Sequence, residues 1–293
     1  MLQETLDGLH IRPEGIYVDC TFGGGGHSKG ILEKLNDKGR LFAFDQDSDA
    51  RQNLPDDARI TFLPHNFRHI TRFLRLHNVP KVHGILADLG VSSHQFDQPD
   101  RGFSTRFEGQ LDMRMDQRQT LAAFDVVNTY SEQQLHRLFE QYGEVTNART
   151  LAKTIVDVRR SVPLKTILNF KTALGSVVKG NPNKYFAQVF QALRIEVNDE
   201  LGALKEMLQQ IPDLLLPAGR AAMITFHSLE DRLVKNFFKK GVFEDEDQSD
   251  PFGKSSVTPL LKAITKKPVA PGEEELKKNP RARSAKLRVA ERL

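Results

Sequence analysis

Four consecutive glycines are the residues of this chain best suited to hold a small ligand. They are Gly23–Gly26, which follow the apolar run Ile16–Asp19 and precede a helical pattern. Glycine has no Cβ, so such a loop lets the backbone come close to a ligand. The free N–H groups at the start of the next helix favour a negative group there. The loop therefore predicts a binding site for a nucleotide-like cofactor.

Two aspartates follow later apolar runs and extend this prediction. Asp45 lies nineteen residues past Gly26, directly after Leu41–Phe44, and Asp88 ends the run Gly84–Asp88. A carboxylate at the end of the second strand of such a sheet accepts hydrogen bonds from the two ribose hydroxyls of a nucleoside. Each feature alone has an ordinary explanation, a tight turn or a helix cap. Their shared place at the carboxyl ends of successive strands favours the binding site.

The charge around the loop indicates which cofactor it binds. Neither register of the glycine cluster gives the G-x-G-x-x-G spacing of a dinucleotide site. Asp19, just before the loop, favours a cationic group over a phosphate. S-adenosylmethionine carries an ammonium and a sulfonium, and we therefore expect this methyl donor rather than NAD.

The elements that position these residues alternate short apolar runs with helix-length spacers. A weaker run at Ile60–Leu63 and a later one near residues 219–226 complete the pattern. Near-continuous apolar strands separated by helices predict a parallel sheet covered on both faces, the α/β class. Residues 102–197 show helical periodicity and no convincing buried strand. The sequence thus predicts a sheet domain in two parts, 1–101 and 198–293, with an inserted helical domain between them.

Two further elements are expected near the carboxyl end. The segment 241–275 is rich in acidic residues, Ser, Pro and Gly, and is expected to be a flexible surface stretch. Leu287–Ala290 is a candidate last strand.

Composition narrows the class of protein. The chain has 293 residues, of which 39% are hydrophobic and 27% charged, enough to build a core and unlike a disordered chain. The single cysteine, Cys20, excludes an intramolecular disulfide and a multi-thiolate zinc site, and no grouping has metal-ligand spacing. We expect a cytoplasmic protein with no membrane span, no secretory signal and no obligate metal.

Seven motifs in fixed order carry a resemblance to a known family. They are Asp19–Ser28, Asp88–Ser93, Arg101–Ser104, Leu111–Asp116, Phe190–Ile195, Phe226–Arg232 and Asn279–Ser284. Over essentially its whole length the chain resembles the bacterial ribosomal RNA small-subunit methyltransferase H family.

The resemblance implies a fold, an activity and a set of residues. The fold would be a Rossmann-like methyltransferase sheet with an inserted helical domain. The enzyme would transfer a methyl group from S-adenosylmethionine to N4 of a cytidine in the decoding region of 16S ribosomal RNA, as naked RNA or in the small subunit. The cofactor positions of the family map onto Gly25, Gly26, His27, Asp45, Phe67, Asp88 and Gln95.

The residue inventory agrees with chemistry at an exocyclic amine. Methylation of cytosine C5 generally needs a cysteine nucleophile, and Cys20 is expected to be core. An amine attacks the methyl group directly, so the site must orient it, and oriented reactants gain up to roughly 7–11 kcal/mol. Asp88 is the candidate that accepts from the amine or orients the cofactor, and His227 is a second candidate catalytic residue. Ser228 is expected to cap the following helix. The candidate aromatic residues for stacking on the base are Phe96, Phe103 and Phe226.

Basic residues suggest where RNA phosphates bind. Residues 277–292 hold seven lysines and arginines against one acid, Glu291, and Arg159–Arg160 is a second candidate.

Two other classes of protein remain as alternatives: a nucleotide-dependent oxidoreductase, and an RNA-binding assembly factor with a vestigial cofactor site.

Overall fold

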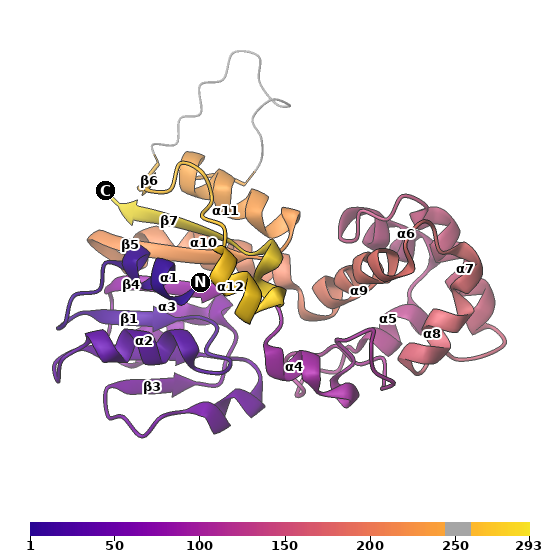
Figure 1. The fold of residues 1–293 in the computed structure, drawn as a ribbon, viewed down its shortest axis with the longest axis horizontal. Helices are drawn as coiled ribbons and strands as arrows, with labels where there is room; N and C mark the ends of the chain where they lie inside the picture. Colours follow the sequence, from indigo (N-terminus) through magenta and orange to yellow (C-terminus); the bar gives the residue numbers. More distant parts are fainter. Residues whose placement is uncertain (244–258) are drawn as a thin grey trace, which may run out of the picture. The chain divides into compact units, whose positions relative to one another are not determined.

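The structure, a computed structural model, describes residues 1–243 and 259–293, and the chain divides into two compact units. The first unit holds residues 1–90 and 201–293, and the second holds 91–200. The second unit therefore begins before residue 102, where the sequence places the domain boundary. The helices and strands of both units are labelled in Figure 1, and each unit has its own hydrophobic core.

The first unit is built on one seven-stranded sheet with the strand order β3-β2-β1-β4-β5-β7-β6. The first five strands are parallel, whereas β7 runs antiparallel to both of its neighbours. The strands are β1 (Ile16–Asp19), β2 (Arg40–Phe44), β3 (Ile60–Leu63), β4 (Val82–Asp88), β5 (Leu215–Thr225), β6 (Leu261–Ala263) and β7 (Lys286–Arg292). The predicted α/β class with a parallel sheet is confirmed.

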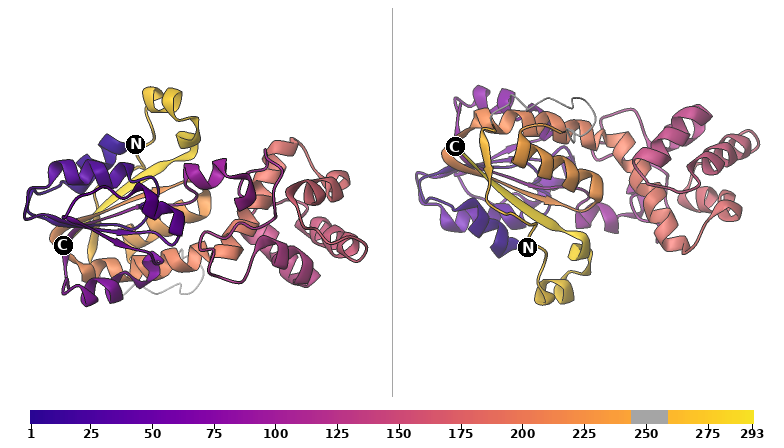
Figure 2. Two further views of the ribbon diagram at one scale, coloured as in Figure 1. Left: turned by 90° about the horizontal axis from the view of Figure 1, so that it is seen from below. Right: turned by 90° about the horizontal axis from the view of Figure 1, so that it is seen from above.

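Helices cover both faces of this sheet (Figure 2). Successive side chains alternate between the faces, so Tyr17 packs under α1 and α2 while Val18 packs under α3, α10 and α11. The helices of this unit are α1 (Leu2–Leu9), α2 (Gly26–Lys34), α3 (Ile70–Leu76), α10 (Glu200–Leu214), α11 (Ser228–Lys240) and α12 (Glu273–Lys278). Because both faces are buried, the strands read as continuous apolar runs, as the sequence suggested.

The second unit is helical in the part of the chain that the structure describes. Its helices are α4 (Ser93–Asp97), α5 (Ala123–Thr129), α6 (Glu132–Gln141), α7 (Ala148–Arg159), α8 (Ile167–Ala173) and α9 (Pro182–Asn198). A capping box begins α6, where Ser131 Oγ accepts from the N–H of Gln134. The apolar side of α6 is buried through Leu135, Leu138 and Phe139, against α7 and α9.

The stretch 241–275, which the sequence predicts to be flexible, contains one short strand. Leu261–Ala263 forms β6, because its backbone pairs with Arg292, Glu291 and Ala290 of β7. Residues 244–258, the middle of that stretch, lie outside the described residues. No helix in the described ranges is long and apolar enough to cross a membrane.

Candidate active site

The glycine loop lies at the carboxyl end of β1 and is shaped for close approach. Gly25 has φ +74°, and a Cβ there would meet the ring of Phe22 at 3.1 Å. At Gly24 and Gly26 a Cβ would meet nothing within 4 Å, so the loop has open space beside it. α2 begins at Gly26, and its first N–H groups are those that a ligand carboxylate would use.

Asp45, at the end of β2, fastens this loop. Its Oδ2 accepts from the N–H of Gly23 at 2.7 Å, and its Oδ1 accepts from the N–H of Asp47 at 2.9 Å. Burial raises the pKa of Asp45 to about 6, and the two N–H donors partly oppose that rise. Each carboxylate oxygen has a further lone pair, so the side chain can also accept from ligand hydroxyls.

Asp19 forms a buried polar network beneath the loop. Its Oδ2 accepts from Ser28 Oγ at 2.8 Å, and its Oδ1 accepts from the N–H of Thr21 at 3.0 Å. Burial raises the pKa of Asp19 to about 6, against the lowering effect of these donors. Thr21 Oγ1 in turn accepts from the N–H of Asp88 at 2.7 Å, so this network holds the loop and the end of β4 together.

Asp88 and His27 face each other across the loop with unused hydrogen-bonding capacity. His27 Nδ1 lies 3.6 Å from Asp88 Oδ2, while His27 Nε2 and Asp88 Oδ1 are buried and have no hydrogen-bond partner. Burial raises the pKa of Asp88 to about 6, opposed by the nearby His27. Burial also lowers the pKa of His27, so the imidazole is neutral near pH 7. Buried polar atoms without partners are rare, and these two indicate a ligand.

His227 lies at the end of β5, beside β4, and does two things. Its Nδ1 accepts from the N–H of Glu230 at 3.4 Å, and its Nε2 lies 3.2 Å from Glu230 Oε1. His227 is therefore the cap of α11, and the prediction that Ser228 caps this helix is wrong. An imidazole nitrogen takes the place of the usual cap oxygen here, while the buried Nε2 of the same ring makes no hydrogen bond to the residues that the structure describes. Glu230 also helps to raise the pKa of Asp88.

The remaining predicted cofactor residues are placed differently. Phe67 lies just past β3, where Asn66 Nδ2 donates to Gln46 Oε1 at 2.7 Å and ties the ends of β2 and β3 together. Gln95 belongs to the second unit, where its side chain completes the capping box of α4 with Ser92. The first unit thus places the loop, His27, Asp45, Phe67 and Asp88 at the carboxyl ends of its strands, and the cofactor roles of these residues and of Gln95 stay predictions.

Two of the three candidate stacking rings lie in the second unit. Phe103 is part of its core and only 5% exposed, and Phe96 packs against that core. Phe226 lies in the first unit, half-buried beside His227, and its N–H donates to Glu230 Oε2. Phe226 is therefore the candidate ring next to a predicted catalytic residue.

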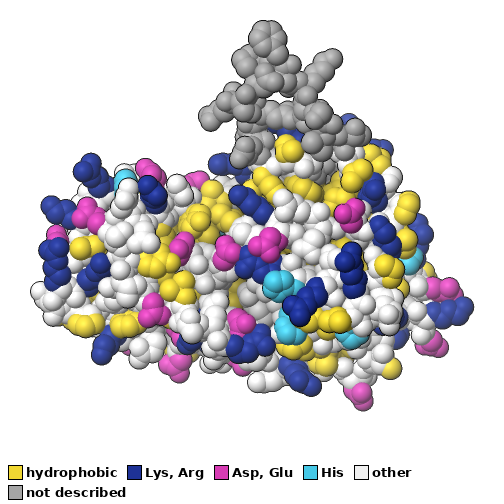
Figure 3. Space-filling model, turned by 180° about the vertical axis from the view of Figure 1, so that it is seen from behind, with side chains coloured by type: hydrophobic (Ala, Val, Ile, Leu, Met, Phe, Trp, Pro, Cys, Tyr) yellow, Lys and Arg dark blue, Asp and Glu magenta, His cyan; other side chains and the backbone are white. Residues whose placement is uncertain are grey.

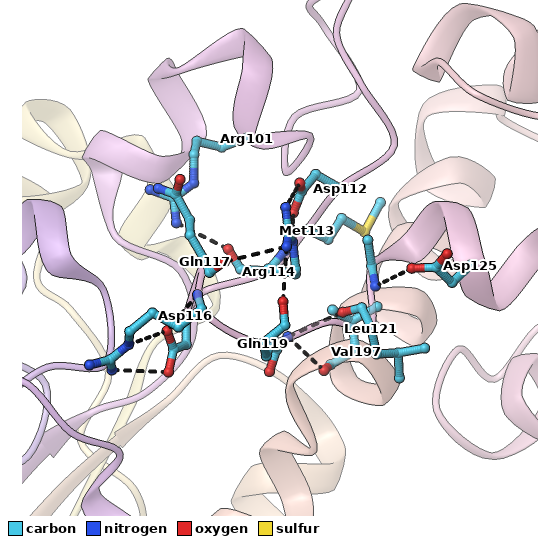
Figure 4. A network of polar contacts seen from close by, with 12 residues as sticks. Arg101, Asp112, Met113, Arg114, Asp116, Gln117, Gln119, Leu121, Asp125 and Val197 are labelled. Carbon is cyan, nitrogen blue, oxygen red and sulfur yellow. Dashed lines mark hydrogen bonds and ion pairs between the residues drawn. The ribbon is translucent and has the colours of Figure 1, made fainter.

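The aspartate–arginine motif at 111–118 builds a rigid turn in the second unit (Figure 4). Arg114 donates to both carboxylate oxygens of Asp112 and to the carbonyl of Gln119. Asn198 accepts from the N–H of Met115 and donates to the carbonyl of Met113, whose φ is +62°. These bonds keep Met113 in a conformation that costs about 1 kcal/mol or more. The motif therefore stabilises the backbone, and the guanidinium of Arg114 is bound within the motif itself.

The basic segment at 277–292 does not form a continuous strip. Arg288 is 7% exposed and donates to both oxygens of Asp231, which also lies 3.3 Å from Lys286. Arg292 donates to the carbonyls of Pro212 and Leu260. These three cations hold β7 in place, and the prediction is wrong for them.

The parallel sheet continued by an antiparallel β7, with glycine loop and acids at the strand ends, defines a Rossmann-like methyltransferase domain. The family model for the MraW methylase family matches residues 1–293, and the chain belongs to that family.

Relatives of similar length share about half of the sequence. The chain is 55% identical over 294 residues to "Ribosomal RNA small subunit methyltransferase H" of Flavobacterium johnsoniae, covering 100% of this chain and 96% of that protein. It is 52% identical to the protein of the same name from Flavobacterium psychrophilum, with both chains covered fully. A solved structure, a putative rRNA-methylase from Clostridium thermocellum, is 10% identical over 99% of this chain and 94% of that one, with TM-score 0.46.

Proposed function

We propose that the protein transfers a methyl group from S-adenosylmethionine to the exocyclic N4 amine of a cytidine in the decoding region of 16S ribosomal RNA. The family and the names of the relatives support ribosomal RNA of the small subunit as the substrate. The observation that carries the chemistry is the pair of partnerless buried atoms, His27 Nε2 and Asp88 Oδ1, beside the glycine loop. Such a substrate also implies a cytoplasmic enzyme.

The residues present fit S-adenosylmethionine. The open space at Gly24 and Gly26 leaves room for a ligand against the backbone. Asp19, Asp45 and Asp88 place three carboxyl groups around that space, which suits a cationic ligand and would repel a pyrophosphate. This arrangement disfavours the oxidoreductase alternative.

We assign separate roles to the residues around the ligand. When bound, S-adenosylmethionine would supply an electrophilic methyl group on a sulfonium: the cytosine amine would form the N–C bond as the S–C bond breaks, S-adenosylhomocysteine would leave, and the amine proton would pass to Asp88 or to solvent. Asp45 holds the glycine loop and accepts from the ribose hydroxyls, while Phe67 packs against the adenine. Asp88 Oδ1 accepts a hydrogen bond from the attacking amine and holds its lone pair toward the methyl group. His227, fixed by Glu230, lies beside this position at the end of β5 and would contact the target nucleotide.

Cys20 argues against methylation at carbon 5. It is buried, and burial raises the pKa of its thiol well above the usual value, so little thiolate forms near pH 7. A thiol in that state is a poor nucleophile. Replacement of Cys20 by Ala should leave methyl transfer nearly unchanged.

The decisive experiment is mass analysis of nucleosides from 16S RNA and from small subunits after incubation with the enzyme and labelled S-adenosylmethionine. N4-methylated cytidine from one position is the expected product, and Asp88→Ala should lower its rate by about a hundredfold. A methyl group on another atom, or a rate for Asp88→Ala within a few-fold of wild type, would contradict the corresponding assignment. Calorimetry with S-adenosylmethionine and with NAD separates the alternatives, because a vestigial site would bind neither.

A further inference from the structure

Two groups among the cations of the second unit have different surroundings. One group is used internally: Arg101, Arg114 and Arg194 donate to backbone carbonyls or to carboxylates of the same unit. The other group lies in residues 149–184, which hold eight lysines and arginines and a single acid, Asp157. Twelve of the thirteen acidic residues of this unit lie outside that segment. The positive charge of the segment is therefore not balanced locally.

Three of these cations form a stripe along α7. Arg149, Lys153 and Arg160 are exposed and, at 3.6 residues per turn, point within about 40° of one another. The opposite side of α7 is buried through Leu151 and Ile155. The stripe therefore faces solvent, because it lies on the side of α7 opposite to the buried one.

Two further exposed lysines lie near the ends of α7. Lys179 follows Val177, whose carbonyl accepts from Asn147 Nδ2 at 2.8 Å at the start of α7. Lys165 follows the turn after α7 and is also exposed. We call Arg149, Lys153, Arg160, Lys165 and Lys179 the α7 basic face. Lys and Arg side chains gather along the left-hand margin of Figure 3, on the second unit.

Among the described residues, four members of this face make no ion pair and no side-chain hydrogen bond. Arg160 is the exception, since its guanidinium lies 3.2 Å from Asp157. Arg159, the other half of the basic pair singled out in the sequence, does not belong to the face. It donates to the carbonyl of Val127 at 2.9 Å, and burial lowers its pKa.

We propose that the α7 basic face binds the phosphate backbone of the RNA substrate, through residues that take no part in methyl transfer. Unpaired like charges on one surface repel each other and contribute nothing to the fold, whereas a polyanion releases counterions when it neutralises them. The centres of protein interfaces are depleted of charged residues, which favours RNA over an acidic protein. The proposal rests on the proposed function for the identity of the RNA.

The test is a triple variant, Arg149→Gln, Lys153→Gln and Lys165→Gln, with a control that removes equal charge elsewhere. The control is Arg75→Gln, Lys235→Gln and Lys262→Gln, which are exposed and unpaired in the first unit. The dissociation constant for naked 16S RNA is measured from about 0.05 to 0.2 M salt. In the face variant, the slope of the logarithm of the dissociation constant against the logarithm of the salt concentration should fall by about 2 to 3. Each lost phosphate contact removes roughly 0.7–0.9 from that slope.

Kinetics then separate binding from catalysis. The face variant should raise KM for RNA by roughly tenfold or more, with kcat at saturating RNA and affinity for S-adenosylmethionine within twofold of wild type. The charge-conserving variant Arg149→Lys, Lys153→Arg and Lys165→Arg should restore both slope and KM.

The outcomes distinguish this proposal from the proposed function. A face variant with the same slope as the control overturns the proposal and leaves methyl transfer to cytidine intact. A loss of binding to small subunits but not to naked RNA also overturns it, in favour of a protein contact. A wild-type protein that methylates no cytidine, yet loses its salt slope in the face variant, supports the face and refutes the proposed function.

Discussion

We expect the affinity for S-adenosylmethionine to depend on pH through the three carboxyl groups of Asp19, Asp45 and Asp88 at the glycine loop. The pKa values of Asp19, Asp45 and Asp88 are each raised to about 6, mainly by burial. A cationic ligand favours the ionised forms, as do ligand hydroxyls that need an acceptor. A carboxyl group that is protonated in the free protein and ionised in the complex must therefore release its proton on binding, which weakens the affinity at low pH.

The size of the effect follows from these values. At about pH 5 only about one tenth of a group with a pKa near 6 is ionised, so each group that must ionise weakens binding about tenfold relative to pH 7.5. If Asp45 and Asp88 both ionise, the loss is about a hundredfold. The ligand-free protein responds in the opposite sense. The contribution of these three groups to its unfolding free energy falls as pH rises from about 4 to about 6, because in the folded state they keep protons that they have released in the unfolded state.

Titration calorimetry with S-adenosylmethionine over this pH range, in two buffers of different ionisation enthalpy, measures both affinity and proton release. Asp45→Asn should reduce the number of protons released at about pH 6. Asp57→Asn is the matched control, because Arg59 lowers the pKa of Asp57 to about 2 and this group does not titrate here. A dissociation constant that is unchanged from about pH 7.5 to 5, with no proton exchange, would refute the reasoning.

Three further predictions concern single contacts. Thr21→Val removes the acceptor for the N–H of Asp88 and should lower methyl transfer about tenfold, whereas Thr21→Ser should retain it; kinetics on both variants check this. Arg288→Met leaves the carboxylate of Asp231 without its main partner and should cost about 3 kcal/mol of unfolding free energy in urea, and an unchanged midpoint would contradict the inward placement of Arg288. Gly102→Ala puts a Cβ 2.5 Å from a carbonyl oxygen at a residue with φ +75°, and should destabilise the protein by about 2 kcal/mol or more. Thermal unfolding measures this loss, and Gly175→Ala is the control, because a Cβ there would meet nothing within 4 Å.

Two strands have the predicted bounds, although they differ in burial. β1 is buried inside the sheet, whereas β3 lies at its edge and is only partly buried, so each was located by its short apolar run and not by full burial. β5 begins at Leu215, earlier than predicted, since Pro217 and Gly219 resemble a turn. Its register against β4 shifts there, and that irregularity accommodates both residues.

What the sequence missed depends on contacts between distant residues. β6 has three residues and exists through its pairing with β7, which no local pattern reveals. The basic count at 277–292 could not show that Arg288 points at Asp231 on α11. Among the site residues, Asp45 and Asp88 could be predicted from the sequence, because they lie at the ends of strands. The contact of Thr21 could not be predicted, because its hydroxyl accepts from a backbone N–H 67 residues away.

The insertion of the second unit between β4 and β5 affects the order in which the chain can fold during synthesis. β4 gains its partner β5 only after residue 215 has been made, and β7 comes at the very end. At ~5–20 residues per second, the open edge of β4 waits on the order of 10 s for that partner. The helical insert, which has its own core, ends at residue 200 and is therefore made before β5 begins at residue 215. During synthesis the insert can form its own core while the sheet still lacks β5 and β7.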